Sequence, residues 1–339
     1  MRNAIKISSV FVVILFISAV VLLLSHSISN TNEKDLQLHA ALLKDSAWEA
    51  PSLYTDLVTS GKERAQVIYG EDLIANTAKY LGPKGSIAQI SNGMNCQNCH
   101  LDAGKRAWGN NFGAVYSTYP KYRERSGSIE DIHKRINDCF VRSLNGQPLD
   151  TNTKEMEAMY AYIKWVGKGV AKGVKPYGSA LGKLNYLDRA ASPDKGKNVY
   201  TQLCQRCHGE RGEGQLNLDS ASFATPPLWG INSYNDGAGL YRLSSFAVFV
   251  KYNMPFNIAS RKSPALTDEE AWDVAAFVNS QPRPHMDQRA DWPDMTKKPI
   301  DFPFGPYADP FTQHQHQFGP FKPIEEWKKL IHKELALRN

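Results

Sequence analysis

The chain has 339 residues, which is too long for one small core and fits two domains with extensions. Its 42% hydrophobic and 22% charged residues are typical of a globular protein and exclude a disordered one. The formal net charge of +6 is too diffuse to indicate nucleic-acid binding, although it favours the attraction of small anions or of an acidic partner.

Residues 1–27 predict a signal peptide or an N-terminal membrane anchor rather than a part of the fold. Arg2 and Lys6 precede an apolar run over residues 7–24. That run is longer than the usual core of a signal peptide, and the two serines after it offer only a weak cleavage site. Cleavage and anchoring therefore both stay open, and in either case we expect the remaining chain to lie in the periplasm.

A helical N-terminal extension over residues 28–90 and a first haem domain over residues 91–168 are predicted next. Apolar residues recur at helical spacing over residues 61–80, where a Gly-Pro pair ends the pattern. The same spacing predicts a helix over residues 155–166, which closes the first haem domain.

A glycine-rich linker over residues 169–190 separates this domain from a second haem domain over residues 191–285. The second domain is expected to begin with a short helix over residues 193–200. It is expected to end with a helix over residues 267–280, which starts with a threonine and a glutamate in a capping box. The two haem domains thus form a degenerate internal repeat, typical of a duplication.

The last segment, residues 286–339, is predicted to be a proline-rich extension. Nine prolines over residues 282–323 exclude a regular helix or a central strand there, and an amphipathic helix is expected over residues 325–337. His314 and His316 are expected to cap or to be solvated rather than to bind metal. The predicted fold class is mainly α: two cytochrome c domains in tandem with irregular N- and C-terminal extensions.

Two Cys-x-x-Cys-His motifs carry the clearest chemical signal. In such a motif the two thiols bond to the vinyl groups of a haem, and the adjacent histidine binds the iron. Two copies behind an export signal favour two covalently attached haem c groups over zinc sites or redox dithiols. The predicted haem attachment residues are Cys96, Cys99, Cys204 and Cys207, and the predicted first axial ligands are His100 and His208.

Each iron also needs a ligand on its other face. For the second haem the sequence favours Met254, in a Met-Pro pair ahead of the terminal helix, with Lys251 as an alternative. For the first haem the candidates are His133 and Cys139. Cys139 is the one cysteine outside the motifs, so it is expected to bind iron, with an inert buried thiol and an intermolecular disulfide as the alternatives.

Cys139 lies on a segment, residues 128–144, that predicts one helix beginning at Ser128. With the helix turned at 100° per residue, Cys139 falls between an apolar stripe and a polar one. The apolar stripe, which suits packing on a haem, consists of Ile129, Ile132, Ile136 and Phe140. The polar stripe, which suits a small oxyanion, consists of Arg135, Arg142 and Ser143, with Arg125 just before the helix. Ordinary solvated arginines are the alternative interpretation.

These residues resemble a known family. The two haem motifs, the Ile-x-x-Cys-x-x-Arg-Ser-x-Asn-Gly segment at residues 136–146 and the Asn-Met-Pro segment at residues 253–255 are similar to the di-haem thiosulfate dehydrogenases, which also act as tetrathionate reductases. The resemblance extends over residues 48–323. It implies two cytochrome c domains whose haems lie close enough for direct electron transfer.

The resemblance also implies site residues. The first haem is the implied active site, with His100 and Cys139 as axial ligands, and the second haem, with His208 and Met254, relays electrons. Substrate-site positions of the family match Arg125, Arg135 and Ser143. Some members use a lysine as a ligand of the second haem in one redox state, a role for which Lys251 is the nearby candidate here.

The leading functional hypothesis is an oxidoreductase that interconverts thiosulfate and tetrathionate. Two dianions must meet in such a reaction, so a cationic pocket is required, and a thiolate can carry the sulfane sulfur. The expected electron partner is a small periplasmic cytochrome c or another redox carrier. The alternatives are a di-haem electron carrier without a substrate and the haem subunit of a multi-protein sulfur-oxidation complex.

Overall fold

The computed structural model describes residues 47–53 and 61–338. The predicted signal peptide or anchor, and most of the predicted extension that precedes residue 61, lie outside the described residues. Within the described part, no helix combines the length and the apolar character that crossing a lipid bilayer requires.

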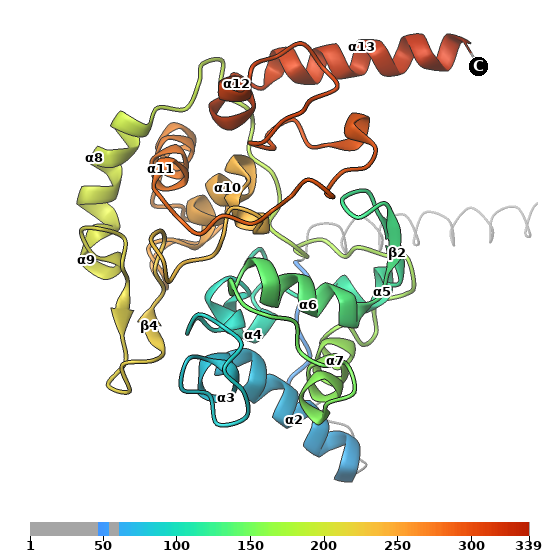
Figure 1. Cartoon of the computed structure of the whole chain (residues 1–339), viewed down its shortest axis with the longest axis vertical. Coiled ribbons are helices and arrows are strands. Elements are labelled where there is room, and N and C mark those ends of the chain that lie inside the picture. The colour runs from blue at the N-terminus through green and yellow to red at the C-terminus, as the bar shows by residue number, and fades with distance from the viewer. Residues whose placement is uncertain (1–46, 54–60, 339) are drawn as a thin grey trace, which may run out of the picture. The chain divides into compact units, whose positions relative to one another are not determined.

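The first haem domain packs against part of the predicted N-terminal extension: α2 (Gly61–Ala75) of that extension pairs with α7 (Lys154–Val166), and together they frame the domain (Figure 1). They approach most closely at Gly70, where an added Cβ would lie 2.0 Å from the carbonyl oxygen of Ala158. Glycine is therefore required at this crossing, since any side chain would push the two helices apart. The predicted helix over residues 61–80 is interrupted after α2, and a short α3 (Thr77–Leu81) completes it.

The helix predicted over residues 128–144 is wrong at its start. Ser128–Glu130 forms a strand, β2, that pairs antiparallel with β1 (Lys121–Arg123), and the helix α6 covers only Ile132–Arg142. The N-cap is Asp131, whose carboxylate accepts a hydrogen bond of 2.8 Å from the backbone N–H of Lys134. The other short elements of this domain are η1 (Cys96–Asn98), α4 (Leu101–Gly104) and α5 (Val115–Thr118).

The second haem domain repeats the helix pair of the first. Here α8 (Pro193–Leu203) crosses α11 (Asp268–Ser280) at Gly196, where an added Cβ would lie 1.9 Å from the carbonyl oxygen of Asp273. The predicted capping box at the start of α11 is present in the structure. The remaining elements are α9 (Gln205–His208), β3 (Gln215–Leu216), β4 (Phe223–Thr225), η2 (Gly239–Tyr241) and α10 (Leu243–Asn253).

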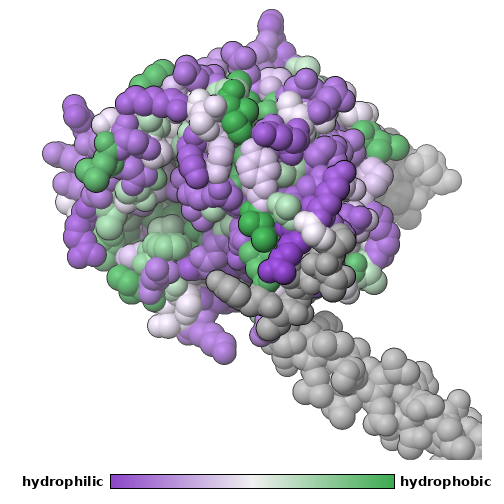
Figure 2. Space-filling model, turned by 90° about the horizontal axis from the view of Figure 1, so that it is seen from below, coloured by the Kyte–Doolittle hydropathy of each residue, from purple (hydrophilic) through white to green (hydrophobic). Residues whose placement is uncertain are grey.

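Each haem domain has its own buried apolar cluster. Leu73, Phe140 and Met159 lie at the centre of the first cluster, and Trp272 and Leu243 at the centre of the second. The face seen in Figure 2 is mostly hydrophilic, with apolar side chains gathered around a hollow. The described chain is thus mainly α, as predicted, with two small two-stranded sheets.

The proline-rich segment contains more helix than predicted. Beside η3 (Met295–Lys297), a six-residue helix α12 (Gln313–Phe318) forms between two prolines, and α13 begins at Lys322 and extends to Arg338. His316 is buried in α12 rather than solvated: its Nδ1 lies 2.8 Å from the carbonyl oxygen of Ile300 and its Nε2 lies 2.9 Å from Asp309. A packed interior therefore orders this segment, although its prolines limit the length of its helices.

Candidate active site

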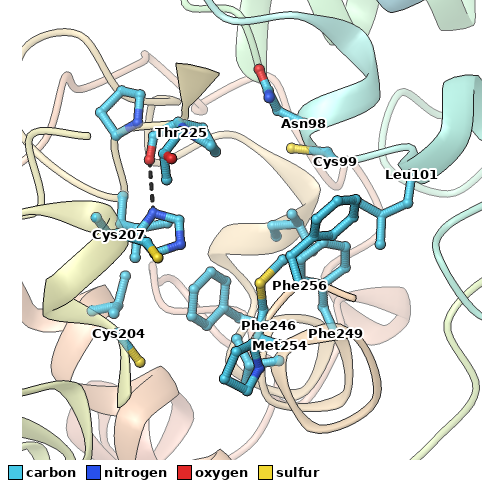
Figure 3. Close-up of a pocket in the computed structure, with 18 of the residues that line it drawn as sticks. Asn98, Cys99, Leu101, Cys204, Cys207, Thr225, Phe246, Phe249, Met254 and Phe256 are labelled. Carbon is cyan, nitrogen blue, oxygen red and sulfur yellow. Dashed lines mark hydrogen bonds between the residues drawn. The ribbon is translucent and has the colours of Figure 1, made fainter. Parts of the chain in front are cut away.

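The second Cys-x-x-Cys-His motif opens onto an apolar cavity of about 570 Å³. Cys204, Cys207 and His208 line it, and the sulfur of Met254, just after α10, points into it (Figure 3). A carbonyl oxygen, that of Pro226, lies 2.9 Å from His208 Nδ1. Burial lowers the pKa of His208, so its ring is neutral and donates from Nδ1, which leaves Nε2 free to bind a metal.

The first motif shows the same arrangement. His100 Nδ1 lies 2.6 Å from the carbonyl oxygen of Asn110, and burial lowers the pKa of His100 to about 4. The neutral ring again has Nε2 available as a metal ligand. Cys96 and Cys99 flank it, and burial raises the pKa of both thiols to about 12, so that neither carries a charge. Both histidines and their neighbouring cysteines therefore fit a covalently bound haem.

The two motifs meet at the cavity of the second. Cys99 lies across this cavity from Cys207 and Met254 (Figure 3), and Asn98 and Leu101 are among the other residues of the first domain that line it. Consequently the attachment segment of one haem borders the space of the other. Electron transfer between the two haems would therefore cover only a short distance.

Cys139 and Arg135 form the chemically distinctive pair of α6. They lie one helical turn apart, and the charge of Cys139 is the main cause that raises the pKa of Arg135 above its usual value. Within the described chain, the Arg135 guanidinium has neither an ion-pair partner nor a hydrogen-bond acceptor. Its positive charge is therefore available to an anion beside the cysteine sulfur.

The apolar stripe predicted on this helix is only partly present. Ile132, Ile136 and Phe140 are buried, whereas Ile129 is 75% exposed. The helical projection was wrong for Ile129 because it lies on β2, where side chains alternate between the two faces of the strand.

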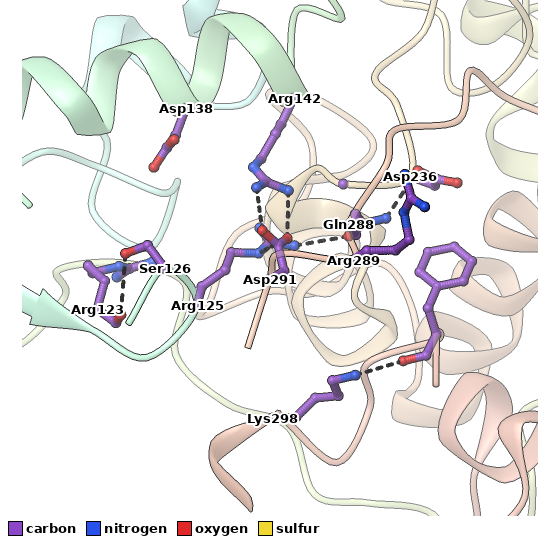
Figure 4. A network of polar contacts seen from close by, with 12 residues as sticks. Arg123, Arg125, Ser126, Asp138, Arg142, Asp236, Gln288, Arg289, Asp291 and Lys298 are labelled. Atoms are coloured by element: carbon purple, nitrogen blue, oxygen red, sulfur yellow. Dashed lines mark hydrogen bonds and ion pairs between the residues drawn. The ribbon is translucent and has the colours of Figure 1, made fainter. Parts of the chain in front are cut away.

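The other predicted cations lie beside a carboxylate. Arg142 donates from both terminal nitrogens to Asp291, at 2.9 and 2.8 Å, and Arg125 Nε lies 2.9 Å from the same carboxylate (Figure 4). Burial, and then the charge of Arg142, lowers the pKa of Arg125 to about 10. Ser143 closes α6, with its backbone N–H donating to the carbonyl oxygen of Cys139 at 2.8 Å. Thus Arg135 and Ser143 flank Cys139, while Arg142 is saturated by Asp291.

Three further charged residues near this site were not singled out by sequence reasoning. Lys121 on β1 is half-buried, with its ammonium 4.5 Å from the ring centre of Tyr119, and burial lowers its pKa to about 8. Glu130 on β2 is 3% exposed, and its Oε2 has no hydrogen-bond partner in the described structure. Asp291 comes from the C-terminal extension. The alternation of β1 and β2 could have indicated Lys121 and Glu130, but no local pattern indicates Asp291.

Two predicted alternative ligands are held by other partners. The Lys251 ammonium donates to the carbonyl oxygen of Leu266 at 2.5 Å and lies 2.9 Å from Asp268, and Lys251 does not line the cavity. His133 stacks on Tyr160 at 4.9 Å. Of the predicted second ligands, Met254 is the one that lines the cavity together with His208.

Comparison with known proteins matches each of the two haem domains to a family model of its own. Residues 86–171 match the family model described as SoxA/TsdA, cytochrome c domain, and residues 193–282 match the cytochrome c model. The thiosulfate dehydrogenase of Allochromatium vinosum is 38% identical over 199 residues, a match that covers 58% of this chain and 72% of that protein. The chain belongs to the thiosulfate dehydrogenase family.

Other members of the family are similarly related. The thiosulfate dehydrogenase of Psychrobacter arcticus is 39% identical, with 60% of this chain and 61% of that protein matched. That of Stutzerimonas stutzeri is 34% identical, with 63% of this chain and 66% of that protein matched. The chain therefore spans just under two thirds of the length of these two relatives.

A solved structure, the thiosulfate dehydrogenase of Marichromatium purpuratum, matches with a TM-score of 0.64 and 32% identity. The match covers 72% of this chain and 50% of that chain. With the two matched domains, it confirms the prediction of two tandem cytochrome c domains that carry two covalently bound haem c groups.

Proposed function

We propose that this protein interconverts thiosulfate and tetrathionate, with Cys139 as the reacting group of the chain. The observation that carries the proposal is the position of Arg135 one helical turn from Cys139 on α6, with no carboxylate at ion-pair distance from its guanidinium among the described residues. All four curated relatives matched are named thiosulfate dehydrogenases, which supports the same reaction.

The pocket must bring two dianions together. Their repulsion falls when cations face them in a site from which water is largely excluded. Arg135 feels the charge of Cys139, and Arg125 and Lys121 add positive charge near Arg135. Ser143, at the end of the same helix, offers a hydroxyl to a sulfonate oxygen. We infer that these residues bind and orient the substrate.

One cysteine is enough to account for all atoms and electrons in the oxidation of two thiosulfates to tetrathionate. The Cys139 thiolate bonds to the sulfane sulfur of one thiosulfate with the loss of two electrons, which gives a cysteine S-thiosulfonate. The sulfane sulfur of a second thiosulfate then attacks it, so that tetrathionate leaves and the thiolate returns. Haems held by the two Cys-x-x-Cys-His motifs would supply the acceptors of these two electrons.

The remaining residues of the proposal hold the two haems. Attachment falls to Cys96, Cys99, Cys204 and Cys207. His100 and Cys139 are proposed as ligands at the first haem, and His208 and Met254 at the second. We further propose a periplasmic location and a small cytochrome c or another redox carrier as the electron partner.

A pair of steady-state assays on the purified di-haem protein tests the proposal. One assay measures thiosulfate oxidation with an artificial electron acceptor, and the other measures tetrathionate reduction with an artificial donor. We expect turnover in at least one direction. A protein whose haems respond to neither compound is an electron carrier, and turnover that needs a second chain indicates a subunit of a larger complex.

A further inference from the structure

We propose that Asp291 is a positioning residue of the thiosulfate site, which holds Arg125 in place and withdraws Arg142 from substrate binding. This inference rests on the proposed function. It assigns different roles to two arginines that the sequence places together, and it assigns a role in the site to the C-terminal extension.

Asp291 reaches the site from a distant part of the chain. It is separated from Arg142 by 149 positions, yet its side chain is only 10% exposed. The neighbouring residues fasten the same segment to the loop between β1 and β2. The backbone N–H of Trp292 donates to the carbonyl oxygen of Arg125 at 2.7 Å, and Pro293 packs so closely on Gly127 that a Cβ there would lie 2.5 Å away. The segment is thus fixed on both the backbone and the side chain of Arg125.

The two arginines use this carboxylate differently. Arg142 makes a fork-to-fork pair, in which two nitrogens donate to the two carboxylate oxygens, and its side chain is 12% exposed (Figure 4). Such a pair fills the Arg142 donors that would otherwise bind an oxyanion. Arg142 is therefore a structural partner of Asp291 rather than a substrate ligand.

Arg125 keeps donors to spare. Its Nε lies 2.9 Å from Asp291, without the alignment of a hydrogen bond. One terminal nitrogen lies 3.4 Å from Gln288 Oε1, and the other has no acceptor among the described residues. The rings of Trp292 and Phe302 lie 5.9 and 5.6 Å from the guanidinium carbon and limit its movement. Arg125 is thus held on one edge and remains available to an anion on the other.

Loss of the carboxylate has two opposing effects on thiosulfate binding. Removing a negative charge strengthens the attraction of a dianion, which lowers KM. Leaving two buried guanidiniums without their shared partner makes them repel each other and displaces Arg125, which raises KM. The second effect dominates here, because a displacement of about 1 Å in a charged site costs on the order of 100-fold. The sign of the change in KM therefore distinguishes positioning from simple repulsion.

The test compares Asp291→Asn, Arg125→Gln and the double variant with the wild-type holoprotein. We expect Asp291→Asn to raise KM for thiosulfate by at least ~10-fold, and to add less than ~2-fold in the Arg125→Gln background, since Asp291 acts through Arg125. A KM that is unchanged or lower in Asp291→Asn, or an equal factor in both backgrounds, overturns the inference.

Two further variants make the test specific. Asp287→Asn is the matched control, because Asp287 lies four residues away in an exposed pair with Arg289 and should leave KM unchanged. Asp291→Glu keeps the negative charge but places it farther from the backbone, so we expect a several-fold rise in KM. This variant also serves as the test if Asp291→Asn loses its haems. A wild-type KM in Asp291→Glu contradicts a positioning role for Asp291. An inactive wild-type protein defeats the proposed function instead, so the two failures can be told apart.

Discussion

The two haem domains share a pair of crossing helices and the geometry of the motif histidine, and they differ in the helix that carries the proposed second ligand. In both, two helices cross at a glycine, where an added Cβ would lie 2.0 Å from a backbone carbonyl oxygen at Gly70 and 1.9 Å from one at Gly196. In both, the motif histidine points Nδ1 at a backbone carbonyl oxygen, that of Asn110 or of Pro226. The duplicated part is thus the part that holds a haem.

The difference lies in the helix that carries the proposed second ligand. In the second domain, α10 is mainly apolar and is followed directly by Met254, whose sulfur projects into an apolar cavity. In the first, α6 places Cys139 beside Arg135, and the C-terminal extension adds Asp291 behind the arginines. Under the proposed function, the same helix pair serves electron relay in one domain and sulfur chemistry in the other, and the charge of the helix that carries the second ligand makes the difference.

The largest effect is expected from replacing Cys139, the residue that most clearly distinguishes the first domain from the second. Cys139→Gly removes the sulfur that we propose as the reacting group, so turnover should fall by at least ~1,000-fold. Both haems should stay attached, as a pyridine haemochrome assay of two haems per chain would show, because the attachment cysteines are untouched. Activity within tenfold of the wild type would exclude the covalent role of Cys139.

The shared frame is tested by Gly70→Ala and Gly196→Ala. Each adds a methyl group within 2.0 Å of a carbonyl oxygen, so each should lower the free energy of unfolding by about 1–3 kcal/mol. Thermal unfolding of the holoprotein measures this. Gly61→Ala, in open space on α2, is the control and should cost nothing. A glycine that tolerates alanine would mean that its domain is not framed by the close helix crossing.

The charge of α6 is tested by Arg135→Gln. A charged hydrogen bond to the substrate is worth about 1.5–3 kcal/mol, so kcat/KM for thiosulfate should fall by roughly 10- to 150-fold. Lys134→Gln on the same helix is the control, since Lys134 is half-exposed and paired with Asp138. Equal effects of the two variants would show that only the net charge of the helix matters.

The smallest expected effect is a pH dependence. The pKa of Lys121 is lowered to about 8 by burial and then by the charges of Arg123, Lys175 and Arg135, with Glu130 opposing them. The ammonium is charged below this pH and neutral above it, so KM for thiosulfate should rise several-fold between pH 7 and 9. Lys121→Arg stays charged and should lose this rise. Parallel pH profiles for the two proteins would assign the titration to another group.

The sequence predicted the parts of this molecule that depend on local patterns. Each haem motif is five residues long, and the capping box of α11 spans four, so both can be read without knowledge of the fold. The position of Cys139 beside Arg135 followed from helical spacing alone, because both residues lie within α6.

What the sequence could not predict depends on contacts between distant segments. Ile129 continues the helical spacing of the apolar residues in α6, but pairing with Lys121–Arg123 makes Ser128–Glu130 a strand. Arg142 looked like a substrate ligand until Asp291, 149 positions away, was seen to occupy its donors. Helical projection places a side chain on a face and says nothing of the partner that arrives there from elsewhere in the chain.

Low-temperature EPR of the oxidised holoprotein tests the central claim most directly, because a thiolate ligand gives a low-spin ferric signal distinct from that of a thioether. We expect two species: one of the thiolate type from the first haem, absent in Cys139→Gly, and one of the His/Met type from the second. A wild-type spectrum without the thiolate-type signal would contradict this claim.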